Sequence, residues 1–558
     1  MKRIQWIIVV LCGLIMACQP EQRNITGAVV STREEASKIG VAIMEQGGNA
    51  FDAMIATDLA LAVCYPYAGN IGGGGFMVYR TQDGGVGTLD YRERAPGAAT
   101  KDMYLDEAGN VIPKLSTLGG LAIGVPGTVA GLFAVHEKFG TLPFEQLIQP
   151  AIDMAREGFV VTAMQAKAWA KLKAVFIAIN GADTPYAKEY KAGDRFVNEP
   201  LAKTLEAIRD RGKAGFYKGP VAAATVARVQ EAGGILSLDD MAGYTPVWRD
   251  PITYQYKDLK IYSMPPPSSG GVCSGQILQM LAPYDIGQYP HNSPQAIQLM
   301  VEAERRSYAD RSKYLGDPDF VYNPTVELLA PTYLKDRMKD FNWEQASQSE
   351  AIVPGSVSWT ESDETTHYSI IDRFGNAVAI TTTLNGQYGS KVYVGEAGFF
   401  LNNEMDDFSS KPGTPNMFGL VGSEANAIAP KKRMLSAMTP TIIEKNGALA
   451  LILGSPGGST IITSVVQTIL NVFEYNMPVQ KAVEAPRVHH QWLPDVVVFE
   501  PNRFPQEVLD TLKAKGYNIE EKRSRIMGCV NAIHIDTDGI IHTGADPRRE
   551  AKAAVSYK

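Results

Sequence analysis

Cysteine is scarce in this sequence, with five residues among 558. Cys12 and Cys18 lie near the N-terminus, and Cys64, Cys273 and Cys529 are far apart in the rest of the chain. No two of them form a CxxC pair or have the spacing of a zinc site, which excludes a disulfide-dense scaffold and a cysteine-based zinc centre. We expect three buried thiols, while a single disulfide, Cys64 with Cys273 or Cys273 with Cys529, remains open.

The sequence also lacks a strong charge of either sign. The formal net charge is −7, and charged residues make up 20% of the chain. No stripe of lysine and arginine with interleaved aromatic residues is present, so nucleic acid is not expected as a partner. With 45% hydrophobic residues, the composition is typical of a globular protein that can bury a sizeable core.

Long hydrophobic runs are missing beyond the first residues. Two basic residues precede an apolar run from Trp6 to Ala17, which is shorter than the roughly 20 residues of a membrane-spanning helix. The pattern predicts a signal peptide over residues 1–17 and an exported protein. The run ends in Leu14-Ile15-Met16-Ala17-Cys18, which resembles a bacterial lipobox and predicts a periplasmic or cell-envelope protein held at a membrane by a lipid on Cys18. The alternative is a plain signal peptide with an incidental cysteine.

The first part of the remaining chain alternates helix and strand signals around a glycine-rich run. Ala28-Val29-Val30-Ser31 is followed by a helix expected at 36–44 and an alanine-rich helix at 49–63. Four consecutive glycines at 72–75 then indicate a close backbone approach. This run is not a phosphate loop, because it lacks the lysine and Ser/Thr and is followed by a strand at 76–80.

The pattern of residues 140–345 is mostly helical, whereas strands dominate after Thr365. The expected strands are bounded by turn signals such as Phe374-Gly375-Asn376. A helix from Thr460 to Tyr475 follows Gly457 and Gly458, and its start offers unpaired main-chain N–H groups for an oxyanion or a carboxylate. The expected strands are Thr366–Ile371, Ala377–Thr383, Thr439–Glu444 and Ala448–Leu453.

Thr365 stands where a polar, loop-like segment ends and a strand begins. If the Glu364–Thr365 bond were cut, Thr365 would carry both a hydroxyl nucleophile and an α-amino group with a pKa of about 7.7–8. That amino group can act as the general base near neutral pH, so no histidine or aspartate partner is needed. The alternative is an ordinary threonine-rich strand start, because β-branched residues favour strands.

Seven motifs share their order and spacing with one known family. Together they make the chain resemble a bacterial γ-glutamyltransferase, a member of the N-terminal nucleophile hydrolase superfamily. The resemblance implies an α/β (α+β) fold in the form of a four-layer αββα sandwich. It also implies a precursor cut into a large subunit, 18–364, and a small catalytic subunit, 365–558, that form one intertwined domain. The motifs are Gly48–Ala53, Gly72–Phe76, Arg92–Pro96, Gly124–Gly127, Thr365–Ser369, Leu401–Phe408 and Gly454–Gly458.

The resemblance also implies a role for each matching residue. Thr365 matches the nucleophile and Thr383 a second threonine that supports it, while Gly457 and Gly458 match the oxyanion-hole amides. Two positions depart from the family: Ala437 stands where a second serine is common, and Phe418 where bacterial relatives often have a lid tyrosine. In the substrate pocket, Arg92 and Ser436 match the groups around the α-carboxylate, and Asn385, Glu404 and Asp407 those around the α-ammonium.

The implied reaction is transfer of the γ-glutamyl group of glutathione or a related amide to water, an amino acid or a peptide, without a metal or organic cofactor. Arg92 offers a cationic fork and Glu404 and Asp407 offer carboxylates, which suit the two charges of a γ-glutamyl head. One alternative is an acylase of the same superfamily that cleaves β-lactam side chains such as glutaryl groups, as cephalosporin acylases do. Another is an inactive, surface-anchored binding lipoprotein.

Overall fold

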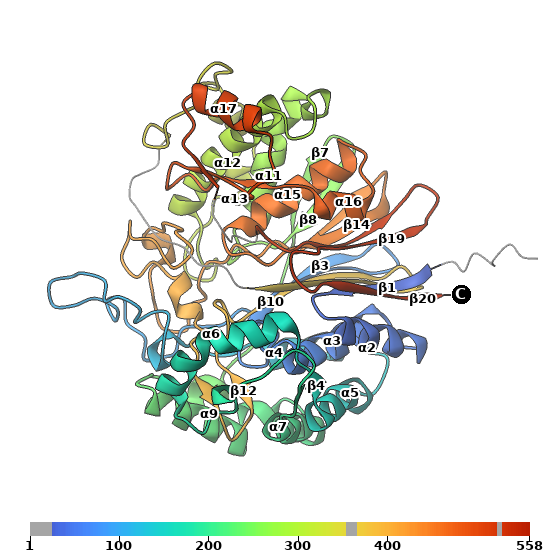
Figure 1. Ribbon diagram of the computed structural model, residues 1–558, viewed down its shortest axis with the longest axis vertical. Coiled ribbons are helices and arrows are strands. Elements are labelled where there is room, and N and C mark those ends of the chain that lie inside the picture. Colours follow the sequence, from blue (N-terminus) through green and yellow to red (C-terminus); the bar gives the residue numbers. More distant parts are fainter. Residues whose placement is uncertain (1–24, 353–364, 522–526, 558) are drawn as a thin grey trace, which may run out of the picture.

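The computed structural model describes residues 25–352, 365–521 and 527–557. Two β-sheets lie face to face in the centre, and helices cover the outer face of each sheet (Figure 1). The protein therefore has the expected four-layer αββα architecture. The signal peptide, Cys18 and Glu364 lie outside the described residues.

The first sheet has seven strands, and neighbouring strands in it are antiparallel. It contains strands from before and after Thr365, and two neighbouring strands from after Thr365 lie between strands from before it. The order is β20 (Lys552–Tyr557), β1 (Ile25–Ser31), β9 (Thr366–Ile371), β10 (Ala377–Thr383), β2 (Gly74–Arg80), β3 (Val86–Asp90) and β6 (Val247–Arg249).

The second sheet has six antiparallel strands and again draws on both halves of the chain. Its order is β19 (Ile541–Ala545), β18 (Asn531–Ile535), β14 (Ala448–Gly454), β13 (Thr441–Lys445), β8 (Leu259–Ser263) and β7 (Ile252–Tyr256). Short strands form three small sheets: β4 (Phe159–Val160) with β5 (Arg195–Phe196), β11 (Tyr393–Val394) with β12 (Phe399–Phe400), and β15 (Val488–His489) with β16 (Val497–Phe499) and β17 (Ile519–Glu521).

The helices divide between the two outer layers (Figure 1). Those beside the first sheet are α2 (Glu34–Glu45), α3 (Ala50–Cys64), α4 (Thr128–Phe139), α5 (Phe144–Glu157), α6 (Ala163–Asn180), α7 (Glu199–Arg211), α8 (Ala214–Tyr217), α9 (Gly219–Glu231) and α10 (Leu238–Ala242). Those beside the second sheet are α11 (Gly270–Leu281), α12 (Pro294–Tyr314), α13 (Thr325–Leu328), α14 (Pro331–Arg337), α15 (Thr460–Phe473), α16 (Val479–Glu484) and α17 (Gln506–Ala514).

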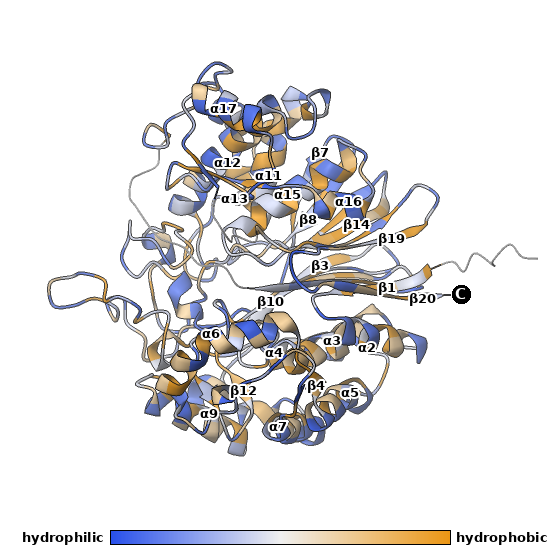
Figure 2. Ribbon diagram, in the orientation of Figure 1, coloured by the Kyte–Doolittle hydropathy of each residue, from blue (hydrophilic) through white to orange (hydrophobic). Residues whose placement is uncertain are grey.

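Successive side chains of the central strands point to opposite faces of the sheet, so one set packs against helices and the other packs between the two sheets. Val378 and Ile380 of β10 belong to the cluster that packs against helices, whereas Ala379 belongs to the cluster between the sheets. Ile442 of β13 and Ile533 of β18 meet it from the second sheet. Figure 2 shows hydrophobic residues where α11 and α15 approach their sheet and mainly hydrophilic residues at the periphery.

Most expected elements of the first and last parts of the chain are present within two residues of their predicted bounds. The glycine-rich run is also packed as expected, because a Cβ on Gly73 would lie 2.0 Å from the Thr383 carbonyl oxygen. The interpretation of residues 140–345 as mostly helical missed β6, β7 and β8. The signal was present, since buried Tyr254 and Tyr256 alternate with exposed Thr253 and Gln255 in a period of two.

The three cysteines in the described part of the chain, Cys64, Cys273 and Cys529, are unpaired and buried, as expected. Within the same residues, no helix has the length and hydrophobicity needed to cross a membrane.

Helix α3 carries a buried carboxyl group into the core under the first sheet. All of its residues are buried, including Asp58. The Tyr368 hydroxyl donates to Asp58 Oδ2 at 2.6 Å, but Asp58 Oδ1 has no hydrogen-bond partner among the described residues. Burial raises the pKa of Asp58 to about 7.

Asp58→Asn is expected to change how stability depends on pH. The raised pKa of Asp58 means that its contribution is fully present below the unfolded pKa of about 4 and is lost as pH rises through about 7. Relative to the unchanged protein, the variant should gain about 2 kcal/mol or more between pH 5 and pH 8. Thermal unfolding midpoints at the two pH values measure this, and an equal difference at both would contradict the titration of Asp58.

Candidate active site

A small cavity of about 20 Å³ lies where β9 and α15 begin and β10 ends. This volume has room for about one water molecule. Its wall combines charged, hydroxyl and apolar side chains from segments far apart in the sequence. The lining residues are Arg92, Arg311, Thr365, Thr383, Asn385, Asp407, Phe418, Leu420, Ser436, Ala437, Met438, Gly458 and Ile461.

Thr365 lies on the wall of this cavity immediately before β9 and is 3% exposed. The Arg549 Nη1 group donates to the Thr365 carbonyl oxygen at 2.8 Å. The next residue is also held, because the Thr366 and Thr32 hydroxyls are 2.8 Å apart. Thr365 thus lines the cavity with its carbonyl and the residue after it both held by other segments of the chain.

Thr383 reaches the same place from the neighbouring strand. Thr382 pairs with Thr366, so Thr383 at the end of β10 lies beside Thr365. The Thr383 hydroxyl accepts from the Asn385 main-chain N–H at 2.6 Å. Asn385 has a φ of 70°, and its side-chain amide donates to the Asn403 carbonyl at 2.9 Å. This turn brings Asn385 onto the cavity wall.

Gly457 and Gly458 form the turn between β14 and α15. Their φ values are 134° and 53°, which L side chains rarely adopt. A Cβ on Gly457 would lie 2.5 Å from Thr460 Oγ1 and 3.0 Å from Gly528 Cα. Among the described residues no acceptor binds either main-chain N–H. Gly458 lines the cavity, whereas Gly457 lies just outside its lining.

Arg92, which also lines the cavity, is the centre of a buried ion cluster. Its Nη1 lies 2.6 Å from Glu404 Oε2, and its Nη2 lies 2.5 Å from Asp407 Oδ2. Glu93 Oε2 is farther away, at 3.7 Å from Arg92 Nη1. The positive and negative groups predicted for the two ends of a substrate are thus paired with one another.

Burial and charge act against each other in this cluster. Burial lowers the pKa of Arg92, but the negative charges of Glu404 and Asp407 raise it by a larger amount. The pKa of Arg92 therefore lies above its ordinary value. Burial raises the pKa of Glu404 and Asp407 against the opposing charge of Arg92. Burial also raises the pKa of Glu93 to about 8, so Glu93 is mostly protonated at neutral pH. Glu404 and Asp407 are the two carboxyl groups in direct contact with Arg92.

Ser436 and Ala437 complete the wall next to α11. The Ser436 main-chain N–H donates to the Pro267 carbonyl at 2.8 Å, and the Ser436 hydroxyl accepts from the Met438 N–H at 3.1 Å. Ala437 contributes only a methyl group to the cavity. The position after Ser436 therefore provides no hydroxyl for a ligand.

The sequence of the whole chain can be compared with known proteins. The family profile described as Gamma-glutamyltranspeptidase matches residues 36–556. The chain is 45% identical to the glutathione hydrolase proenzyme of Escherichia coli (strain K12) over 538 residues, which cover 95% of this chain and 92% of that relative. It is also 45% identical to the glutathione hydrolase proenzyme of Pseudomonas aeruginosa over 528 residues, covering 94% and 93%. The chain belongs to the γ-glutamyltranspeptidase family.

Solved structures agree with the fold of this γ-glutamyltranspeptidase family member. The cephalosporin acylase from Bacillus halodurans has a TM-score of 0.84 and 26% identity, over 95% of this chain and 96% of that chain. The γ-glutamyltranspeptidase from Helicobacter pylori has a TM-score of 0.57 and 40% identity, over 62% of this chain and 99% of that chain. The backbone is thus similar to that of an acylase, while sequence identity is higher to the γ-glutamyltranspeptidase.

Phe418, predicted at the tip of a lid, is buried and closes the cavity. The segment around it is tied to the acidic residues beneath. Asn416 Nδ2 donates to Asp407 Oδ1 at 2.9 Å, and the Met417 N–H donates to Asp406 Oδ2 at 2.8 Å. Asp407 is therefore held both by Arg92 and by the segment that covers the cavity.

The structure adds Arg311 of α12, which the sequence analysis missed, to the cavity wall. Arg311 is 5% exposed, and its Nε donates to the Ser269 hydroxyl at 2.8 Å. No partner for its terminal nitrogens is found among the residues that the structure describes. The sequence signal for Arg311 was that α12 has charged residues on every face, so some of them must be buried. The sequence does not show which of these side chains faces a cavity and which faces solvent.

Proposed function

We propose that this protein is an exported, self-cleaving enzyme that transfers the γ-glutamyl group of glutathione and related amides to water, amino acids or peptides. One observation carries the proposal: Thr365, immediately before a central strand, shares a cavity with a buried arginine, a buried carboxylate and Gly458, whose main-chain N–H has no acceptor among the described residues. The substrate class follows from the relatives, which are named glutathione hydrolase proenzymes. No metal or organic cofactor is part of this proposal.

The first step is cleavage of the chain before Thr365. The Thr365 hydroxyl attacks the preceding carbonyl carbon, and water opens the resulting ester. The products are a large subunit, 18–364, and a small subunit, 365–558, which stay together because both contribute strands to both sheets. The new α-amino group of Thr365 then takes the hydroxyl proton when Thr365 attacks the γ-carbonyl of the donor. The γ-amide C–N bond breaks, and the leaving amine takes that proton. Water or an acceptor amine then attacks the γ-glutamyl ester and releases the Thr365 hydroxyl.

The second step is insertion of a zwitterionic head between paired charges. The donor α-carboxylate pairs with Arg92, aided by Ser436, and its α-ammonium pairs with Glu404 and Asp407, aided by Asn385. The contacts of Arg92 with Glu404 and Asp407 are thereby exchanged for contacts with the substrate, so the buried groups keep oppositely charged partners. Arg311 adds positive charge on the same wall.

Charge that develops on the γ-carbonyl oxygen is held by the main-chain N–H groups of Gly457 and Gly458. Both precede a 14-residue helix, α15, whose positive dipole end favours negative charge. Each such donor contributes roughly 3 kcal/mol to lowering the barrier. Thr383 supports Thr365 from the adjacent strand.

The cavity must enlarge before a substrate can enter, because its volume is near that of one water molecule. The segment from Asn416 to Leu420 is the part of the wall that covers Asp407. Its outward movement would break the Asn416–Asp407 bond and free Asp407 for the ammonium. Phe418 has no hydroxyl that could bind an acceptor amino acid or peptide. This affects how often the acyl group passes to an acceptor and how often it passes to water.

An acylase for glutaryl-type side chains is the second candidate, favoured by the TM-score of 0.84 to the cephalosporin acylase. Such an enzyme has no use for an ammonium pocket, whereas Glu404 and Asp407 both face Arg92. Identity to the glutathione hydrolase proenzymes is also higher, at 45% against 26%. An inactive binding lipoprotein is disfavoured because the nucleophile, the charges and the glycine turn meet at one cavity.

Thr365→Ala is expected to remain a single chain, because no hydroxyl is left to attack the preceding carbonyl. The unchanged protein should separate on a denaturing gel into two fragments, the smaller with 558 − 365 + 1 = 194 residues. Thr366→Ala is the matched control, which loses its contact with Thr32 but should still be cleaved. A small fragment whose N-terminus is not Thr365 would refute the nucleophile.

Asp407→Asn is expected to lower kcat/KM for γ-glutamyl amides by about 10- to 100-fold, since a charge-assisted contact is worth roughly 1.5–3 kcal/mol. Asparagine keeps the shape and can still accept from Asn416. Self-cleavage should persist, because it uses the chain's own peptide bond. A glutaryl amide, which lacks the α-amino group, should be nearly insensitive. Equal losses for both substrates would exclude Asp407 as the ammonium ligand and favour the acylase.

A lipid on Cys18 is proposed as the membrane anchor, because the sequence that ends at Cys18 resembles a lipobox. Two acyl chains on this cysteine would attach the protein stably, whereas a single chain gives only marginal binding. Activity should then sediment with membranes, and Cys18→Ser should abolish incorporation of labelled fatty acid. Unchanged labelling of that variant would exclude Cys18 as the site of lipid attachment.

A further inference from the structure

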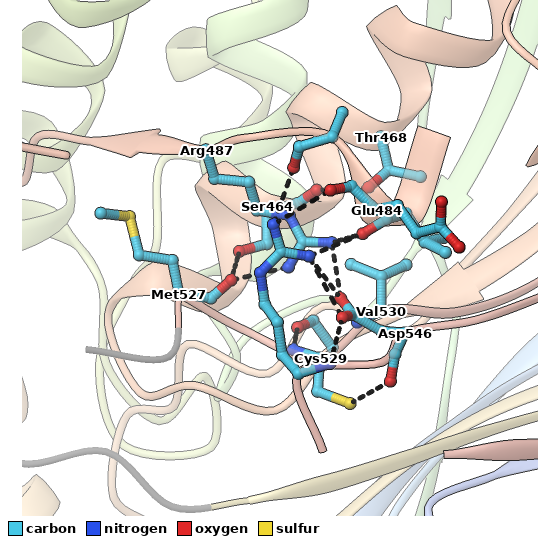
Figure 3. A network of polar contacts seen from close by, with 12 residues as sticks. Ser464, Thr468, Glu484, Arg487, Met527, Cys529, Val530 and Asp546 are labelled. Atoms are coloured by element: carbon cyan, nitrogen blue, oxygen red, sulfur yellow. Dashed lines mark hydrogen bonds and ion pairs between the residues drawn. The ribbon is translucent and has the colours of Figure 1, made fainter. Parts of the chain in front are cut away.

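The turn before the last strand, Asp546 to Arg549, is built around a buried carboxylate. Asp546 Oδ2 accepts from Arg487 Nη2 at 2.7 Å and from the Val530 N–H at 3.0 Å (Figure 3). Asp546 Oδ1 accepts from the Arg548 N–H at 3.0 Å. Asp546 is fully buried, so these contacts fix the turn from which Arg549 projects.

The same network holds the segment behind the glycine turn. Arg487 Nη1 donates to the Met527 carbonyl at 2.7 Å (Figure 3). The Cys529 N–H donates to the Ser455 hydroxyl at 2.9 Å. Gly528, between Met527 and Cys529, lies against Gly457. The Asp546 turn is therefore connected by direct contacts to the wall that supports Gly457 and Gly458.

Arg549 extends from this turn to the nucleophile. It is 5% exposed, and its guanidinium carbon lies 5.4 Å from the centre of the Tyr67 ring. Its Nη1 donates to the Thr365 carbonyl oxygen at 2.8 Å. The contact joins residues 184 positions apart in the sequence and fixes the carbonyl of the residue that supplies the nucleophile.

We propose that Arg549 is a positioning residue for Thr365, which sets the direction of its hydroxyl and, after cleavage, of its α-amino group. This rests on the function proposed above. Thr365 becomes a chain end when the bond before it is cut, so the backbone on one side no longer restrains it. The hydrogen bond from Arg549 then holds the remaining peptide plane.

The guanidinium charge of Arg549 also acts on the α-amino group that Thr365 carries after cleavage. A positive charge this near disfavours the ammonium form and keeps the group available as a base at neutral pH. His367 of β9 adds no charge, because burial lowers its pKa to about 3. The other charged groups facing the cavity are Arg92 after β3, paired with Glu404 and Asp407, and Arg311 of α12.

The test compares Arg549→Gln and Arg549→Lys with Arg228→Gln. Arg228 is a matched control, because it also donates to a main-chain carbonyl, that of Ile179 at 2.6 Å, but lies on α9 in the outer helix layer. Self-cleavage, kcat, KM and the pH dependence of kcat/KM are measured for each cleaved protein with a γ-glutamyl amide.

For Arg549→Gln, the acid limb of kcat/KM should move upward by about one pH unit, and kcat should fall about ten-fold or more with little change in KM. Lysine keeps the charge but not the planar fork, so Arg549→Lys should lower kcat and leave the acid limb in place. Arg228→Gln should leave both unchanged.

Wild-type kcat and an unmoved acid limb in Arg549→Gln would overturn the role of Arg549. Absence of γ-glutamyl activity in the unchanged protein would instead overturn the proposed function. If Arg549→Gln is folded but uncleaved, positioning is supported, since the contact is present before cleavage. If it does not fold, Arg549→Lys decides: a lowered kcat with an unmoved acid limb supports the role, and an unchanged kcat refutes it.

Discussion

The active site depends on the position of β9 between β1 and β10 at the centre of the first sheet. Its register places Thr366 opposite Thr382 and Ser369 opposite Val30. Tyr368 then packs toward the helices, while Ser369 faces the second sheet and donates to the Asn531 carbonyl. A slip of one residue would turn Tyr368 toward the second sheet and Ser369 toward the helices. Because both faces of β9 are buried against different partners, the register is fixed, and with it the position of Thr365.

The buried charges show that this site is not built for stability alone. Removing Arg92, Glu404 and Asp407 from water costs free energy that their mutual attraction only partly returns. The helix and sheet layers supply the stability through apolar packing on both faces of both sheets. A cluster with paired charges beside a small cavity is, by contrast, suited to exchange partners with a zwitterionic ligand.

Fold and chemistry carry different information in this family. The backbone is similar to that of a cephalosporin acylase, so the four layers alone do not select a substrate. In the proposed function, the distinction rests on side chains at the ends of β3 and β10 and in the segment around Phe418. These residues come from connections, which vary more freely than the packed strands.

The sequence by itself determined the family, the strand that begins after Thr365 and most of the elements near it, because these follow from local patterns and contiguous motifs. It did not predict β7 and β8, whose alternation is short and lies among helices. Only the tertiary structure decided that Arg92 pairs directly with Asp407, that Arg311 faces the cavity and that Arg549 holds Thr365. The contacts of Arg92 and Arg549 join residues 315 and 184 positions apart, and their geometry is set by packing of whole layers, which no local pattern encodes.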